Sequence, residues 1–83
     1  MSHEKRLKEI RDRLTVVRRI KKVRKGLGLS RKEVGRLANT GEDFIRRMEN
    51  GDPVDVWSPK VYDVACVLGL IITGKGAAEP RRV

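Results

Sequence analysis

Two acid–arginine pairs stand at helical spacing in the stretch 41–51. Glu42 precedes Arg46 by four residues, and Asp43 precedes Arg47 by four. An acid one turn before a base stabilises a helix by about 0.2–0.5 kcal/mol per pair, and acids near a helix N-terminus suit its dipole. The same pairs could instead position each arginine for a bidentate hydrogen bond to guanine, or let the acids accept from cytosine N4. A third interpretation is a face that binds a protein partner.

The other reactive side chains do not form a catalytic or metal-binding pattern. His3 is the single histidine and Cys66 the single cysteine, so neither a disulfide framework nor a cysteine metal cluster is expected. Cys66 is interpreted as a small packed residue. Gly26 and Gly28 do not follow a strand, so they do not form a dinucleotide fingerprint. We expect no enzymatic activity, no cofactor, no metal and no small-molecule ligand.

Positive charge dominates the chain and is concentrated in its first part. The 83 residues have a formal net charge of +9, with 37% charged and 4% aromatic residues. Residues 1–25 contribute +8 and residues 26–51 contribute +1, whereas residues 52–83 are neutral overall. The scarcity of aromatics argues against a β-sandwich or barrel and favours an all-α domain. The charge indicates an acidic partner, nucleic acid first and an anionic membrane surface second.

The chain also lacks the marks of a membrane or secreted protein. Its start is charged, and no apolar run approaches the ~20 residues needed to span a bilayer. We therefore expect a soluble protein in the reducing cytoplasm, associated with the nucleoid and without a membrane partner.

Residues 3–25 predict one long helix, because they contain no glycine or proline. Two apolar stripes run along it, centred roughly 130° apart. They consist of Leu7, Ile10, Leu14 and Val17, and of Val16, Ile20, Val23 and Leu27. One straight helix cannot bury both stripes on one surface. Either it breaks near Thr15, or, as we favour, it is continuous and the first stripe contacts a partner subunit.

The basic surface of this helix has three interpretations. It can be a solvated face. It can hold DNA phosphates, which would compensate for the near-neutral segment 26–51 with contacts that are salt-sensitive and independent of sequence. As a membrane-surface helix, it lacks Trp or Phe on its apolar side.

Three shorter helices are expected after it. The Ser30–Glu33 segment is a capping box, so a second helix begins near residue 31 and ends at 39–41, where Asn39 tolerates a left-handed turn. A third helix covers 41–49. Ser58 caps a fourth, with Pro59 in its first position.

The segment after the fourth helix is short and β-prone. Leu70–Thr73 either covers the core or pairs as a strand across a two-fold axis. The tail, residues 74–83, is rich in Gly, Ala, Pro and Arg and is expected to be mobile.

Two short helices joined by a tight turn, with small residues where they cross, are typical of a helix-turn-helix. Residues 20–51 resemble the Xre/Cro-like helix-turn-helix family of phage and bacterial repressors. The matching segments are Ile20-x-x-Val23-Arg24, Gly28-Leu29-Ser30-Arg31-Lys32-Glu33-Val34-Gly35, Ala38-Asn39-Thr40-Gly41 and Ile45-Arg46-Arg47-Met48-Glu49-Asn50-Gly51. In the fourth helix the match continues at Val61, Ala65, Leu68 and Gly69.

The resemblance implies an all-α, lambda-repressor-like bundle of four to five helices. To this the residues outside the resemblance add a long basic N-terminal helix and a possible short C-terminal strand. Residues 1–15 would be a basic extension continuing into the first helix. Residues 16–73 would be the DNA-binding domain, and residues 74–83 a flexible tail.

The resemblance also implies a role for each matching position. Arg24 and Glu49 would form a structural ion pair, and residues 42, 43, 46 and 47 would face the major groove. Arg31 would meet a phosphate at the start of the second helix. The full set expected at the DNA backbone is Ser30, Arg31, Lys32, Asn50 and Lys25. Candidate dimer contacts are Leu7, Ile10, Leu14, Val17, Leu70, Ile71 and Ile72.

The expected function is a sequence-specific regulator that binds double-stranded DNA as a homodimer on a palindromic operator. A phage Cro- or repressor-like role, or an antitoxin-type autorepressor, fits the size of the chain. The acids at residues 42–43 and the near-neutral segment 26–51 leave two alternatives. One is a protein-interaction module on a helix-turn-helix scaffold, and the other is a non-specific DNA binder driven by residues 5–25.

Overall fold

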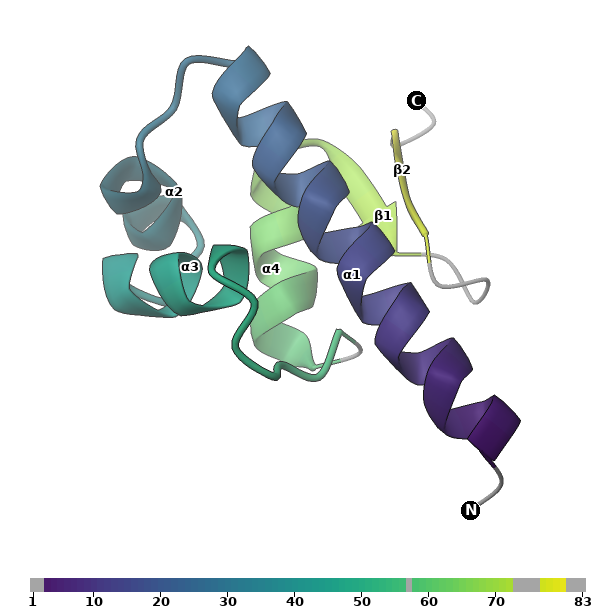
Figure 1. Cartoon of the computed structure of the whole chain (residues 1–83). Coiled ribbons are helices and arrows are strands. Elements are labelled where there is room, and N and C mark those ends of the chain that lie inside the picture. Colours follow the sequence, from purple (N-terminus) through teal and green to yellow (C-terminus); the bar gives the residue numbers. More distant parts are fainter. Residues whose placement is uncertain (1–2, 57, 73–76, 81–83) are drawn as a thin grey trace.

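The computed structural model describes residues 3–56, 58–72 and 77–80, and for residues 3–7, 9 and 10 it describes the backbone alone. Over these residues the protein is mostly helical, with four helices and a two-stranded sheet. The order is α1 (His3–Gly26), α2 (Arg31–Leu37), α3 (Glu42–Glu49), α4 (Pro59–Val67), β1 (Leu70–Ile72) and β2 (Ala78–Pro80). Figure 1 shows α1 as a long diagonal helix with α2 and α3 on one side and the small sheet on the other.

The first helix is continuous through Thr15. The Thr15 hydroxyl donates a hydrogen bond to the carbonyl of Arg11 at 2.9 Å, as a residue inside a helix does, and so does not cap a new helix. The prediction of one uninterrupted helix is confirmed. Its first described side chains, those of Lys8 and of residues 11–15, are exposed or half-buried, and burial among the described side chains begins at Val16.

The two apolar stripes of α1 do not separate as predicted. Val16 and Ile20, from the second stripe, are fully buried, but Val17 from the first stripe is also buried, at 8% exposure. The prediction that Val17 contacts a partner subunit is therefore wrong. Both α3 and β2 pack against α1, so the buried arc of this helix is wider than one stripe.

The start of α2 is fixed by the predicted capping box. The Ser30 hydroxyl accepts from the Glu33 N–H at 3.0 Å, and the Ser30 N–H donates to Glu33 Oε1 at 3.1 Å. That backbone hydrogen bond lowers the pKa of Glu33. The helix ends before Asn39, which has a φ of 56° and turns the chain towards α3. Ser58 caps α4, as predicted, by accepting from the Val61 N–H.

One hydrophobic core joins all four helices. Its fully buried large side chains are Ile20, Ile45, Met48, Val16, Val34, Val61 and Val64. The predicted inward residues of α4, Val61, Ala65 and Leu68, are all buried. This core fixes the faces that α1 and α3 leave exposed.

The small sheet corrects two predictions about the C-terminal segment. The β-prone run does form β1, but it pairs antiparallel with β2 of the same chain, with Leu70 opposite Pro80 and Ile72 opposite Ala78. The prediction of a flexible tail is thus wrong for Ala78–Pro80; residues 74–76 and 81–83 lie outside the described residues. Leu70 is 2% exposed, so its side chain belongs to the core and cannot serve as a dimer contact.

Candidate functional site

The turn between α2 and α3 is built on a close backbone approach at Gly35. The Thr40 and Gly41 N–H groups both donate to the Gly35 carbonyl, at 2.9 and 3.1 Å. A Cβ added at Gly35 would lie 2.4 Å from the carbonyl carbon of Gly41 and 2.7 Å from the nitrogen of Glu42. These contacts set how α3 leaves α2. The sequence match included Gly35 without indicating this contact, which depends on the crossing of the two helices.

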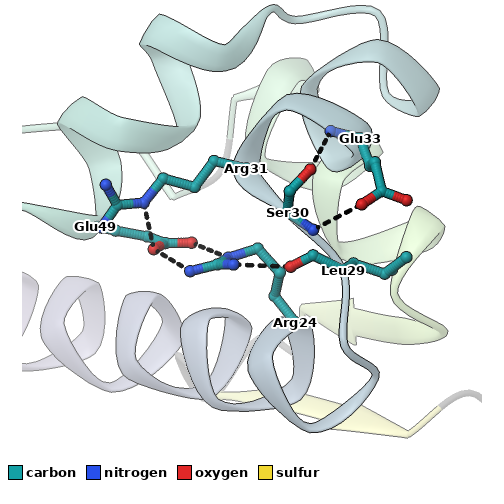
Figure 2. A network of polar contacts seen from close by, with 6 residues as sticks. All are labelled: Arg24, Leu29, Ser30, Arg31, Glu33 and Glu49. Carbon is teal, nitrogen blue, oxygen red and sulfur yellow. Dashed lines mark hydrogen bonds and ion pairs between the residues drawn. The ribbon is translucent and has the colours of Figure 1, made fainter.

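A buried ionic network holds the far end of α3 to α1 (Figure 2). The Nε and Nη2 atoms of Arg24 donate to the two carboxylate oxygens of Glu49 at 2.6 and 2.8 Å. Its Nη1 donates to the carbonyl of Leu29 at 2.8 Å. The Arg24–Glu49 ion pair is present as expected, and with the Leu29 contact it also fixes the loop that leads into α2.

Arg31 takes part in the same network, which the sequence did not indicate. Its Nε donates to Glu49 Oε1 at 3.1 Å, and its side chain is 33% exposed. Arg31 was expected to reach a DNA phosphate. In the structure Glu49 engages its Nε, whereas the two terminal nitrogens take no part in that contact.

The network controls the ionisation of its members. Burial alone would raise the pKa of Glu49, but hydrogen bonds from Arg24 and Arg31, together with their charges, hold that pKa below its ordinary value. The hydrogen bond with Glu49 raises the pKa of the Arg24 guanidinium. Both groups are therefore charged over the whole neutral range.

The lowered pKa of Glu49 makes stability depend on acid. Because the folded-state pKa lies below the unfolded value of about 4.3, the contribution of Glu49 is complete above that value and is lost as pH falls through the folded-state pKa. We expect ¹³C NMR titration of the Glu49 side-chain carboxyl to give a midpoint clearly below about 4.3. A Glu49 midpoint at or above the ordinary value would contradict the network.

The exposed face of α3 carries four charged side chains, Glu42, Asp43, Arg46 and Arg47. The two arginines share one acid. Asp43 Oδ1 accepts from Arg46 and Asp43 Oδ2 lies 3.0 Å from Arg47 Nε. The predicted Glu42–Arg46 pair is wrong, because Arg46 turns to the acid three residues before it. Both arginines remain open to solvent, 54% and 66% exposed.

The other residues expected at a DNA backbone lie in different settings. Ser30 is engaged in the capping box, whereas Lys25, Lys32 and Asn50 are exposed. Asn50 directly follows Glu49, and Arg31 reaches that same residue. The structure thus brings the Arg31 side chain to the C-terminal end of α3, where Asn50 is the C-cap residue.

Of the remaining candidate dimer contacts, three are accessible to differing degrees. Leu14 is 39% exposed, and Ile71 and Ile72 are half-buried. The side chains of Leu7 and Ile10 lie outside the described residues. In the part of the chain that the structure describes, no three His, Cys, Asp or Glu side chains gather as a metal site, and no helix is both long and apolar enough to cross a membrane.

Comparisons of this chain with protein-family models, with curated proteins and with solved structures gave no match.

Proposed function

We propose that the protein is a sequence-specific regulator of transcription that binds double-stranded DNA, with α2 and α3 as a helix-turn-helix in a lambda-repressor-like bundle. In this proposal α3 lies in the major groove, which is wide enough to admit a helix and presents a distinct pattern for each base pair. The protein binds as a homodimer to a palindromic operator and represses by occluding transcription. The resemblance of residues 20–51 to Xre/Cro-like repressors supports this function.

The observation that carries the proposal is the pair of exposed arginines on a helix whose opposite face is buried. Arg46 and Arg47 are both held by Asp43, while the opposite face of α3 is anchored by the buried Ile45, Met48 and Glu49. An arginine held in place loses less side-chain freedom on binding. A positioned guanidinium is suited to bidentate contact with guanine O6 and N7.

The experiment that tests this function is selection of bound duplexes from a random pool. A consensus should emerge from the wild-type chain, and palindromy in it would report the homodimer. For a dimer the two half-sites should lie about 34 Å apart, one turn of DNA. Recovery of a pool without consensus would reject sequence-specific binding.

Arg47 gives the sharper test of base reading. Because a good bidentate contact contributes about 1–3 kcal/mol of discrimination, Arg47→Ala should reduce the preference for the consensus roughly 5- to 150-fold. The measurement is the ratio of dissociation constants for the consensus and a single-base variant, at fixed salt. An equal loss of affinity on every sequence would contradict the role.

Lys32→Ala is the matched control for Arg47→Ala. Lys32 is exposed on α2, and a phosphate contact should weaken all sequences alike. Arg31→Ala is a poorer control, since Arg31 also binds Glu49 and its loss would disturb the scaffold.

A protein-interaction module is the second candidate, and one observation favours it. The four exposed charges of α3 cancel, and Asp43 pairs with both arginines. Such a face does not by itself attract a polyanion. If Asp43→Asn and Glu42→Gln leave DNA binding unchanged at every salt concentration and no consensus is selected, this second function is the better one.

A further inference from the structure

A row of cations runs along the outer side of α1. Lys8, Arg11, Arg18, Lys22 and Lys25 are all exposed, and with Thr15 among them they recur at spacings of three and four residues. This spacing places them on one helix face. At 1.5 Å per residue the row, here named the α1 stripe, is about 25 Å long.

The α1 stripe faces away from the core. Ile20 is fully buried, and Arg24 reaches Glu49 of α3. At 100° per residue, the stripe residues Arg11, Arg18 and Lys22 lie about 160–180° around the helix from Ile20. Asp12 is the one acid of α1 whose side chain the structure describes, and it is half-buried beside the stripe.

The exposed face of α3 points in another direction. The inner face of α3 packs on the core and on α1 through Ile45, Met48 and Glu49, so Arg46 and Arg47 turn away from α1. Figure 1 shows α3 on one flank of α1. A straight duplex seated on α3 therefore leaves the α1 stripe uncovered, and Lys25, which was expected at the backbone of that duplex, is assigned here to the stripe instead.

We propose that the α1 stripe binds the phosphate backbone of a second DNA segment, so that one chain joins two duplexes. The inference rests on the proposed function of α3, which supplies the first duplex. Charge complementarity identifies the occupant: B-DNA carries one negative charge per about 1.7 Å of axis, so a duplex laid along the row offers more phosphates than the row has cations. Contacts of this kind carry no sequence information.

Two other occupants fit the α1 stripe less well. A second copy of α1 would place five cations against five more, and like charges repel. A membrane-surface helix buries its apolar face in the lipid interface. From Val16 onward the apolar face of α1 is covered by the core, and Leu14 is the large apolar residue that α1 leaves exposed in its described part.

A bead-capture experiment tests the second DNA site. The selected duplex is fixed to beads, and a labelled duplex of random sequence is added with the full chain. The variant Lys8→Gln/Arg11→Gln/Arg18→Gln/Lys22→Gln keeps good helix formers at exposed positions. It should bind the fixed duplex with wild-type affinity and salt slope. Because four phosphate contacts lower affinity roughly 100-fold between 50 and 200 mM salt, removing them should reduce retention of the labelled duplex at least ~10-fold.

The matched control is Arg11→Lys/Arg18→Lys, which keeps the charge and should retain the labelled duplex as the wild type does. Circular dichroism checks that both variants fold. The inference is overturned if the glutamine variant retains the labelled duplex normally. It is equally overturned if that variant loses about 3.6 from the salt slope on the fixed duplex, since the stripe would then contact the same DNA.

Two further outcomes would reassign the α1 stripe. Binding of phosphatidylserine vesicles that is lost in the glutamine variant, with no retention of a second duplex, would indicate a membrane. If light scattering gives the glutamine variant a different molecular mass from the wild type, the α1 stripe would be an interface between copies. If the wild type selects no consensus, the proposed function fails by itself, and capture with two random duplexes then tests the stripe separately.

Discussion

Replacing Glu49 with glutamine is expected to lower the free energy of unfolding by about 3–5 kcal/mol. Glu49 has a fully buried side chain and accepts from Arg24 and Arg31. Glutamine is nearly the same size but removes the negative charge, so the buried guanidinium of Arg24, with a side chain 9% exposed, would stand without a counter-ion. A domain of this size has a total stability of roughly 4–12 kcal/mol. The variant should therefore lose a large part of this stability, and it should unfold if the total lies at the lower end of the range.

Matched variants separate the two arginines that bind Glu49. Arg24→Gln should cost about as much as Glu49→Gln, because it leaves the buried carboxylate with the partly exposed Arg31 as its remaining partner. Arg31→Gln should cost about 1 kcal/mol or less, since its side chain is one-third exposed and screened by solvent. Urea unfolding followed by circular dichroism measures each value. A loss below about 1 kcal/mol for Glu49→Gln would mean that the pair contributes no more than a surface salt bridge.

The double variant Arg24→Gln/Glu49→Gln shows why the single variants lose stability. The loss can come from the missing ion pair or from the charge that is left buried without its partner. If unpaired charge dominates, the double variant should be more stable than either single variant, because both charges are removed together. If the two single losses simply add, the residues act independently and the ionic network has no coupling energy.

Local sequence signals predicted much of the secondary structure correctly. The capping box at Ser30, the serine cap and proline of α4, and the left-handed Asn39 all occur where the sequence indicated. Each of these signals acts within a few residues, so no knowledge of tertiary contacts is needed to interpret it.

Long-range packing explains what the sequence did not indicate. Val17 is buried because both α3 and β2 pack on α1, and β2 exists because β1 finds its partner in the tail of the same chain. Periodicity within α1 carries no information about either contact. The pairing of Arg46 with Asp43, and not with Glu42, has a different reason. Ion pairs at spacings of three and four residues differ little in energy, so the sequence does not decide between them.

Replacing Gly35 with alanine is the second large effect that we expect. The new Cβ would meet the Gly41 carbonyl carbon at 2.4 Å and its oxygen at 2.5 Å. These atoms belong to the backbone and cannot rotate aside as the end of a side chain does. Overpacking a core costs about 1–3 kcal/mol, whereas alanine gains up to ~1 kcal/mol of helix propensity over glycine. The steric clash should outweigh the gain in helix propensity, so Gly35→Ala should lower the free energy of unfolding by about 1–2 kcal/mol or more.

Gly26→Ala supplies the control for this substitution. Gly26 is also helical, has an ordinary φ, and a Cβ there would meet nothing within 4 Å. The same chemical change should thus be neutral or stabilising by up to ~1 kcal/mol. Thermal or urea unfolding of both variants separates the effect of the steric contact at Gly35 from the effect of helix propensity, which both substitutions share.

The direction of the Gly35→Ala effect distinguishes a tight turn from a loose one. If α2 and α3 can separate at little cost, the variant should be as stable as Gly26→Ala, and the close approach of Gly35 to Gly41 would carry no energy. If they cannot, stability falls, and whatever fold remains should present Arg46 and Arg47 at an altered angle to α2.

On the proposed function, the affinity of Gly35→Ala for the selected DNA sequence should then fall by more than its loss of folded protein accounts for. A loss of affinity that matches the unfolded fraction alone would mean that the angle between α2 and α3 does not matter for binding.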